Sequence, residues 1–335
     1  MFKQLIARQM VNRRSKVYPV EYLEQKHVDL SLPYPNDSSF FYGGDKEGNA
    51  FICRMAFRDP KRRHEYWFDF YLKGLGFFGI KDDPGPDGEG FRMGNLKWEP
   101  LEIGKQWRIT YEGPIKDENE KIHQTKVDLI FTGEHPIYNF AESSNGKLEA
   151  KAIASEKWTR DFFLKLKELS QIHVEQTGNI KGTIILDGKR FDLTMRAMKD
   201  HTFGSRNWLT WDRHYWMSGS ADNGYRWTVT VLRLDFLGRL TAGFVIDKDG
   251  RVDAIVDCTS LEDVSAKQLL PDNGIITLKM RSGKTNTLEF FRHGHFPYLM
   301  DESYSMYEGI GSYKFNDSEG LGMVEFGFKK AMYQI

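Results

Sequence analysis

The sequence predicts an all-β protein made of two antiparallel β-barrels joined by a helical linker. Three observations support this fold class. Most segments alternate apolar and polar residues with the period of a half-buried strand. These segments are separated by short turns rich in Gly, Asp and Asn, and one stretch near the middle has helical periodicity instead. Each half supplies roughly eight or more strands, enough to close a barrel and leave no sheet edge exposed.

The strands can be assigned in order along the chain. Residues 39–58, SFFYGGDKEGNAFICRMAFR, predict a β-hairpin, and residues 106–113, QWRITYEG, place Trp107, Ile109 and Tyr111 on one face of a strand. Three segments of the C-terminal half predict hairpin turns, because each has Gly where a positive φ angle is needed: LDGKR, ADNGY and DKDGR.

The helical stretch is SEKWTRDFFLKLKELSQI, residues 155–172, with Ser155 as the expected N-cap. Its apolar residues recur at helical spacing: Trp158, Phe162, Leu166 and Leu169. Because strand patterns flank it on both sides, we place the domain boundary here. The prediction is an N-terminal barrel of residues 1–160 and a C-terminal barrel of residues 161–335.

Charge and hydropathy argue against several classes of protein. The formal net charge is +0, whereas nucleic-acid-binding proteins usually carry a basic excess, so we expect no nucleic-acid partner. No apolar run approaches the roughly 20 residues of a membrane helix, so we expect no transmembrane segment. The two cysteines, Cys53 and Cys258, give no disulfide framework and fit a reducing compartment. We therefore expect a cytoplasmic protein; the sequence does not indicate its oligomeric state.

The first twenty residues carry five basic residues and no acidic residue. They lack the apolar core and the small-residue cleavage site of a secretory signal. Two interpretations stay open: a short mitochondrial presequence, or a solvated basic arm that packs on the first barrel.

Residues 74–79, GLGFFG, match the dinucleotide pattern G-x-G-x-x-G after a strand. The pattern binds pyrophosphate only where a helix begins at these glycines. The following residues 81–90, KDDPGPDGEG, predict a loop instead, and no βαβ pattern occurs elsewhere. We therefore expect no nucleotide cofactor.

Acids, histidines, arginines and tryptophans gather in residues 195–219, MRAMKDHTFGSRNWLTWDRHYWMSG. Adjacent strand residues point to opposite faces, so Asp200 and His201 share a site only if the backbone bends, which Gly204 would allow. One interpretation makes Asp200 a buried proton donor and His201 a relay or water activator. In another, Asp200 pairs with Arg206 or His201 and pins a tight turn. A third gives it a role in orienting a ligand.

Four of the eight tryptophans lie within twenty residues: Trp208, Trp211, Trp216 and Trp227. They form either barrel core or the wall of an apolar ligand site, where π faces would stabilise a carbocation. For His214, beside Tyr215, a satisfied core histidine and a catalytic base are both open.

Two further pairs of residues lie two positions apart on a strand: His173 with Glu175, and His293 with His295. His173 and Glu175 lie on one face of a strand, as a His–carboxylate dyad or as a solvent-side pair. His293 and His295 also share a face and would need a third ligand to hold a metal. Because no HExxH or CxxC motif accompanies them, we expect no metal site.

The segments HVEQTGNIKGTIILDGKRFDL, MKDHTFGSRNW and RHYW resemble the lipocalin-like double-barrel family. That family includes hydroxyneurosporene synthase (a carotenoid 1,2-hydratase), kievitone hydratase, AttH-like proteins and some fungal Diels–Alderases. Its second barrel begins with His-x-Glu-Gln, which matches His173, Glu175 and Gln176. Its turn motif is usually Arg-Asp-His-Ser-Trp-Gly-x-Arg, which matches residues 199–206. GLGMVEFGF resembles its closing strand, with Glu325 in the usual acidic place.

The resemblance covers nearly the whole chain, but three positions of the turn motif depart from it: Lys199 replaces Arg, Thr202 replaces Ser and Phe203 replaces Trp. The resemblance implies two lipocalin-like antiparallel β-barrels and chemistry without a cofactor on apolar polyene, isoprenoid or polyketide molecules. It does not identify one substrate, because fold alone does not fix function.

The expected site therefore has two catalytic residues, Asp200 and His201. The expected ligand-binding residues are Arg206, Trp208, Trp211, His214, Tyr215, Trp216, His173, Glu175 and Glu325. The leading hypothesis is an enzyme that hydrates, isomerises or cyclises a hydrophobic small molecule. The alternatives are a lipocalin-like carrier of such a molecule and a scaffold whose second barrel binds a partner.

Overall fold

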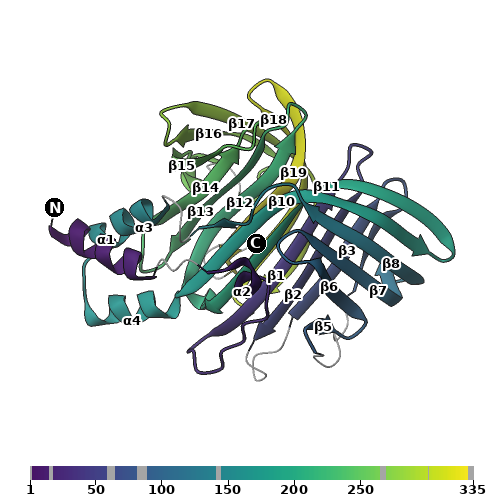
Figure 1. The fold of residues 1–335 in the computed structure, drawn as a ribbon, viewed down its shortest axis with the longest axis horizontal. Helices are drawn as coiled ribbons and strands as arrows, with labels where there is room; N and C mark the ends of the chain where they lie inside the picture. The colour runs from purple at the N-terminus through teal and green to yellow at the C-terminus, as the bar shows by residue number, and fades with distance from the viewer. Residues whose placement is uncertain are drawn as a thin grey trace. The chain divides into compact units, whose positions relative to one another are not determined.

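The computed structural model describes residues 2–14, 18–58, 65–80, 89–140, 145–264, 269–300 and 302–330. Contacts divide the chain into two compact units. The first unit comprises Tyr18–Tyr138 and Gln171–Ser205, and the second unit comprises Met1–Val17, Asn139–Ser170 and Arg206–Ile335. Strands dominate both units (Figure 1), and the described strands pair antiparallel throughout. The predicted all-β fold is confirmed.

The first unit is built on one large sheet with strand order β4-β3-β2-β1-β11-β10-β8-β7-β6-β5. Strand β4 also pairs with β7, so the sheet closes on itself; a short strand, β9, adds to β10. The strands are β1 (Pro35–Gly44), β2 (Ala50–Arg58), β3 (Glu65–Leu72), β4 (Gly76–Gly79), β5 (Phe91–Met93), β6 (Leu96–Glu102), β7 (Gln106–Asp117), β8 (Ile122–Gly133), β9 (Tyr138–Asn139), β10 (Gln171–Leu186) and β11 (Lys189–Ser205).

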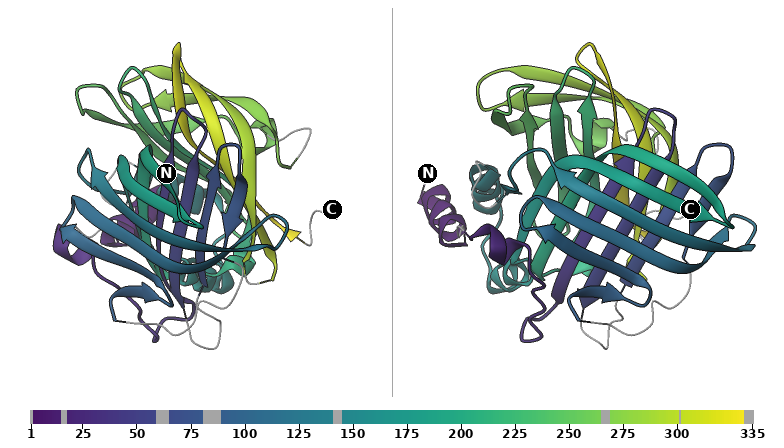
Figure 2. Two further views of the ribbon diagram at one scale, coloured as in Figure 1. Left: turned by 90° about the vertical axis from the view of Figure 1, so that its right-hand side faces the viewer. Right: turned by 45° about the vertical axis from the view of Figure 1, so that its right-hand side comes forward.

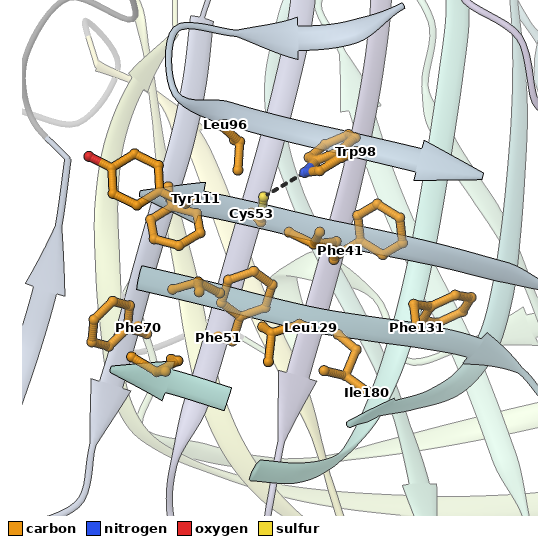
Figure 3. Close-up of a cluster of buried hydrophobic side chains, with 14 of the residues drawn as sticks. Phe41, Phe51, Cys53, Phe70, Leu96, Trp98, Tyr111, Leu129, Phe131 and Ile180 are labelled. Atoms are coloured by element: carbon orange, nitrogen blue, oxygen red, sulfur yellow. Dashed lines mark hydrogen bonds between the residues drawn. The ribbon is translucent and has the colours of Figure 1, made fainter. Parts of the chain in front are cut away.

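Large apolar side chains fill the interior of this sheet (Figure 3). Along β7, Trp107, Ile109 and Tyr111 all point inward, as their spacing predicts. The indole N–H of Trp98 donates to Cys53 Sγ at 3.2 Å, so the thiol is held inside the core. Burial raises the pKa of Cys53 well above its usual value, and the thiol is therefore chemically quiet.

The second unit contains a closed antiparallel barrel of eight consecutive strands. These are β12 (Trp211–Ala221), β13 (Arg226–Leu234), β14 (Arg239–Ile246), β15 (Val252–Cys258), β16 (Asn273–Met280), β17 (Thr285–Met300), β18 (Tyr304–Phe315) and β19 (Ser318–Lys329). Its core is apolar, and Trp227 stacks on Phe315 within it at 5.2 Å between ring centroids. Trp227 is thus a core residue, not part of a site wall.

The helical linker is confirmed, but as two helices, α3 (Asn145–Ser155) and α4 (Arg160–Glu168). The predicted N-cap, Ser155, ends α3 instead. Thr159 caps α4, because its hydroxyl accepts the Phe162 N–H at 3.1 Å. Phe162 and Leu166 are buried, as their helical spacing predicts.

The N-terminal residues form a helix, α1 (Phe2–Arg14), which packs on α3. Ala7 and Val11 are buried, so this segment is not a solvated arm on the first barrel. The remaining short helices are α2 (Val20–Leu23), α5 (Leu261–Val264) and the 3₁₀ turn η2 (Trp208–Thr210). Across the described part of the chain, no helix has the length and apolar character needed to cross a membrane.

The division into barrels differs from the predicted boundary at residue 160. Strands β10 and β11 lie between β8 and β1, so Gln171–Ser205 completes the sheet of the N-terminal half. Figure 2 shows these teal strands continuing the purple and blue sheet. Most of the predicted turn motif therefore lies in the first unit. The sequence cannot reveal this, because the pairing of β1 with β11 joins residues more than 150 positions apart.

Within the GLGFFG segment, residues Gly76–Gly79 form β4, which pairs with β3; no helix begins there, so the segment is no dinucleotide fingerprint. Of the loop predicted at residues 81–90, residues 81–88 lie outside the described residues. The predicted hairpin turns are confirmed. Gly188, Gly224 and Gly250 have φ angles of 82°, 92° and 81°.

Candidate functional site

Five side chains from five neighbouring strands stand directly opposite one another in the first unit. We call this set the acid–base row: Glu175 (β10), Asp200 (β11), Phe40 (β1), Arg54 (β2) and Trp67 (β3). They alternate along their strands with core residues, so the row faces away from the barrel interior. All five are nevertheless buried. Small-molecule sites place a few polar groups among apolar and aromatic side chains, so this buried row is the candidate site.

His173 completes the acidic end of the row. It lies two residues before Glu175 on β10, and its Nε2 is 2.6 Å from Asp200 Oδ2 and 3.2 Å from Glu175 Oε1. Burial by itself lowers the pKa of His173, but the two carboxylates outweigh it and raise the pKa to about 9. At neutral pH the imidazolium therefore lies between two carboxylates. Its side chain is 25% exposed, which leaves this end of the row open to a ligand.

The basic end of the row is compensated locally. Arg54 donates to Ser38 Oγ and to Glu65, both at 2.9 Å. Its guanidinium also lies 4.4 Å from the ring centroid of Trp67. A buried arginine with these partners is a fixed positive charge, so the row has a positive end and an acidic end, with Phe40 between them.

His201 does not share a site with Asp200, contrary to one sequence interpretation. Strand β11 pairs without interruption through Gly204, so the backbone does not bend as that interpretation required. The His201 side chain points to the opposite face, where Nε2 lies 2.8 Å from Asp37 Oδ1 and Nδ1 lies 2.8 Å from the Leu23 carbonyl. The pairing of Asp200 with Arg206 or His201 is also not found, since its partner is His173.

Lys199 accompanies His201 on the inner face. Its ammonium pairs with Glu24, and the indole N–H of Trp107 donates to the other oxygen of Glu24. Burial lowers the pKa of Lys199, although Glu24 opposes this. Together with the Leu23 contact of His201, this ion pair ties the α2 segment to the barrel, which is a structural role for two residues of the sequence motif.

Several expected ligand-binding residues gather in the second unit. Trp208 and Trp211 have ring centroids 4.5 Å apart. Trp211 lies 5.5 Å from the ring of His214, which contacts Glu325 through Nε2. Arg206 lies over both tryptophan rings.

Two neighbours of His214 differ in their environment. Tyr215 points into the barrel core, where its hydroxyl donates to the Thr259 carbonyl at 2.7 Å, so it does not line the same face as His214. Trp216 shares the face of His214 and stands opposite Glu325 in the ladder.

Among the described residues, one group has the geometry of a metal site: His173, Glu175 and Asp200, whose ligand atoms lie within 4.8 Å of one another. The nitrogen–oxygen distance of 2.6 Å between His173 and Asp200 is that of a hydrogen bond. Ligand atoms that share a zinc ion, each about 2.0–2.2 Å from it, lie farther apart than this in a tetrahedral site. His293 and His295 bond separately to Ser312 and Arg292.

Sequence reasoning missed three members of the row and one residue of the second unit: Phe40, Arg54, Trp67 and Tyr304. Alternation along β1 and β2 places Phe40 and Arg54 on the outward face, which is a signal for their orientation. The alternation pattern does not predict that these outward side chains are buried, because the outward face of a sheet is normally solvated.

Comparison with known proteins supports the fold. A family model described as a domain of unknown function (DUF7064) matches residues 23–329. A solved structure of an AttH-like protein from Nitrosomonas europaea superposes with a TM-score of 0.60 at 10% identity, covering 93% of this chain and 96% of the other. Kievitone hydratase from Nectria haematococca gives 0.52 at 9% identity, with coverage of 93% and 96%. No curated protein sequence matches. The lipocalin-like double-barrel fold expected from the sequence is confirmed.

Proposed function

This chain belongs to the DUF7064 family, whose description assigns no reaction, and we propose a function from the chemistry of the acid–base row. The protein is an enzyme that adds water to, isomerises or cyclises an apolar small molecule of the isoprenoid, polyene or polyketide type. It works by acid–base chemistry, without a cofactor.

One observation carries the proposal. A partly accessible imidazolium, His173, shares its Nε2 between Asp200 and Glu175 at one end of a buried row that includes Phe40. Strongly shifted titratable groups that also have specific charged partners cluster at functional sites. An apolar substrate gains from such a site because the buried acid protonates carbon in a medium of low polarity.

The protons can be followed through a hydration. The His173 Nε2–H bond breaks and an O–H bond forms on Asp200. That O–H bond then breaks as a C–H bond forms at one carbon of the substrate double bond, leaving a carbocation beside the π face of Phe40. A water molecule forms a C–O bond to the cation, and its surplus proton passes to the Glu175 carboxylate and back to His173. Loss of a different substrate proton, in place of water addition, gives isomerisation.

The fold adds indirect support. Kievitone hydratase is named as a hydratase and shares this double-barrel architecture, although at 9% identity that likeness concerns the fold alone. The carrier alternative would place a ligand in a barrel interior, as lipocalins do. Large buried side chains such as Trp107, Phe131 and Trp227 occupy the two interiors, which favours the outward row as the binding place.

The test begins with native mass spectrometry of protein purified from its own source, to identify a co-purified apolar molecule. That molecule is then incubated with the protein in ¹⁸O-labelled water, and the product is analysed for the label. The change Asp200→Asn keeps the shape of the side chain and removes its acid, so turnover should fall roughly 10²- to 10⁴-fold. Ligand binding should persist.

The matched control is Asp192→Asn on the same strand, where the exposed carboxylate pairs with Arg190. It should leave turnover unchanged. If Asp200→Asn turns over like the wild type, the acid assignment fails. If the wild type binds the molecule and never converts it, the carrier function replaces the enzyme. A chelator should have no effect on turnover, and loss of activity with it would point to a metal at His173, Glu175 and Asp200.

A further inference from the structure

A second acid–base arrangement lies in the second unit, on strands β12, β18 and β19. His214 Nδ1 lies 2.5 Å from the Tyr304 hydroxyl, and His214 Nε2 contacts Glu325. All three residues are buried. His214 and Glu325 alternate with the core residues Tyr215 and Phe326, so the arrangement faces away from the barrel core.

The hydrogen-bond chemistry gives these contacts a direction. A carboxylate only accepts, so Glu325 holds the imidazole with its proton on Nε2. Nδ1 then has a free lone pair and accepts the Tyr304 hydroxyl proton. A His–carboxylate pair arranged in this way activates a hydroxyl group, because the imidazolium formed on proton transfer is stabilised by the carboxylate behind it.

Two buried hydrogen-bond donors lie beside Tyr304. The ring centroids of Trp208 and Trp211 are 5.5 Å and 5.9 Å from that of Tyr304. Both indole N–H groups are buried, and among the described residues neither has a hydrogen-bond partner. Leaving a buried donor unsatisfied destabilises the fold, and an indole N–H can only donate. The pair can therefore donate to an acceptor that the described residues do not supply.

The charge next to these donors indicates what the acceptor is. The guanidinium carbon of Arg206 lies 5.3 Å from the ring centroid of Trp208 and 5.8 Å from that of Trp211. A positive charge and two N–H donors favour an oxygen that carries negative charge. The aromatic rings favour a flat, unsaturated molecule around that oxygen.

We propose that Arg206, Trp208, Trp211 and Tyr304 form a second site, which binds a planar unsaturated carbonyl compound and moves a proton at the carbon next to the carbonyl group. Tyr304 gives its proton to His214, and its oxygen takes the proton from that carbon. The C–H electrons form a C=C bond, and the C=O π electrons move to oxygen, which the indole N–H groups stabilise. The reverse steps return a proton that has exchanged with solvent. This proton transfer needs no oxidant and no cofactor. The proposal is independent of the function proposed for the acid–base row.

The binding half of the proposal is tested with 2-naphthoate, a flat aromatic carboxylate, by isothermal titration calorimetry. Trp208→Phe and Trp211→Phe keep the ring and remove the donor, so each should weaken binding by about 10-fold or more. The matched control is Trp158→Phe, whose indole donates to the Ile153 carbonyl outside this cluster; it should bind as the wild type does. A wild type that does not bind 2-naphthoate overturns the proposal.

The reaction half is tested with 2-tetralone in deuterated buffer, with NMR following deuterium at the carbons next to the carbonyl group. The wild type should exchange them faster than buffer alone. Tyr304→Phe should lower the protein-dependent rate roughly 10²- to 10⁴-fold. The control Tyr307→Phe, on the same strand, should have no effect. Exchange by Tyr304→Phe at the wild-type rate overturns the assignment.

His214 and Glu325 act through Tyr304 and are positioning residues. His214→Gln and Glu325→Gln should slow exchange of 2-tetralone while 2-naphthoate affinity stays at the wild-type value. A purely structural role would lower binding and exchange together, and that result would count against the relay. Circular dichroism spectra of every variant confirm that the protein is folded before either rate is compared.

Discussion

Asp200 and His201 illustrate how one residue step separates two roles. Successive side chains of a strand point to opposite faces, so Asp200 meets His173 on the outward face and His201 meets Asp37 on the inward face. The two positions read as a single motif in the sequence. In the structure, Asp200 belongs to a partly accessible acid–base group. His201 is buried and holds the α2 segment against the barrel through the Leu23 carbonyl.

The raised pKa of His173 makes a prediction about stability and pH. A histidine whose pKa in the folded protein is about 9, against an ordinary value of about 6.5, stabilises the fold below pH 6.5 and loses this effect as the pH rises toward 9. The stability difference between the wild type and His173→Gln should therefore shrink by on the order of 2–3 kcal/mol between pH 6.5 and 9.5. Urea unfolding at several pH values measures it.

The control is His293→Gln, at an exposed position. Its stability should differ little from that of the wild type at every pH between 6.5 and 9.5. A difference for His173→Gln that does not depend on pH would mean that Asp200 and Glu175 do not hold the imidazolium in the folded protein.

Gly327 sets the approach of the His214–Tyr304 pair. A Cβ atom at this position would lie 2.3 Å from His214 Cε1 and 2.6 Å from Tyr304 Cε1, well inside contact distance. Gly327→Ala should therefore destabilise the fold by about 1–3 kcal/mol through overpacking, with a lower urea midpoint. At Gly283 an added Cβ meets nothing within 4 Å, so Gly283→Ala should cost only the backbone strain of its positive φ. Equal midpoints for Gly327→Ala and the wild type would contradict this packing.

At the scale of elements, local chemistry decides where helices begin. Ser155 and Thr159 both precede helical sequence, and both are good N-cap residues. The choice falls on Thr159, which accepts from the Phe162 N–H, while the Ser155 hydroxyl donates back to the Ala152 carbonyl within α3. A cap is read from the sequence only when one candidate stands alone.

Thr159→Ala should lower the stability of the protein by about 1 kcal/mol, because it leaves the Phe162 N–H without its acceptor. Ser155→Ala removes a hydroxyl of the same kind that caps no helix start, and it should cost less than about 0.5 kcal/mol. Chemical denaturation of the two variants side by side measures the contrast. The reverse order of stabilities would show that α4 begins at Ser155 in solution.

The sequence predicts features that depend on near neighbours. The glycine turns at Gly188, Gly224 and Gly250 are of this kind, as is the alternation that turns Trp107 inward, because each needs only a few adjacent residues. The acid–base row depends instead on register between strands far apart in the chain. Asp200 stands opposite Phe40 only because β11 pairs with β1, and nothing local in either strand specifies that pairing.

At the scale of the whole molecule, the domain boundary predicted at residue 160 is misplaced for the same reason: the sequence does not show which distant strands pair. Two barrels and a helical linker follow from counting strand patterns, and both are confirmed. The chain, however, leaves the first unit for the linker helices and returns to it for β10 and β11 before it enters the closed barrel. Strand counts on either side of the linker cannot show such a return, because a strand pattern does not identify its partner.

The return of the chain makes a prediction about fragments. In the first unit, β11 pairs with β1 from Pro35↔Ser205 to Gly44↔Arg196, and β10 pairs with β8 from Gly178↔Gly133 to Leu186↔Thr125. A fragment of residues 18–160 lacks both strands. Strands β1 and β8 would then be open edges with unpaired backbone groups, and the sheet could not close. A fragment of residues 18–205 contains every strand of the sheet.

We therefore expect residues 18–205 to unfold cooperatively in urea with a dispersed NMR spectrum, and residues 18–160 to show neither property. The two fragments share the same N-terminus and strands β1 to β9, so they differ only in the residues from 161 onward. The change Gly182→Pro in the longer fragment tests whether the pairing of β10, and not the greater chain length, stabilises the sheet. Proline removes a backbone donor in the middle of β10, between β8 and β11, and should bring the longer fragment close to the behaviour of the shorter one. Cooperative unfolding of residues 18–160 would instead show that the N-terminal half closes a barrel without β10 and β11.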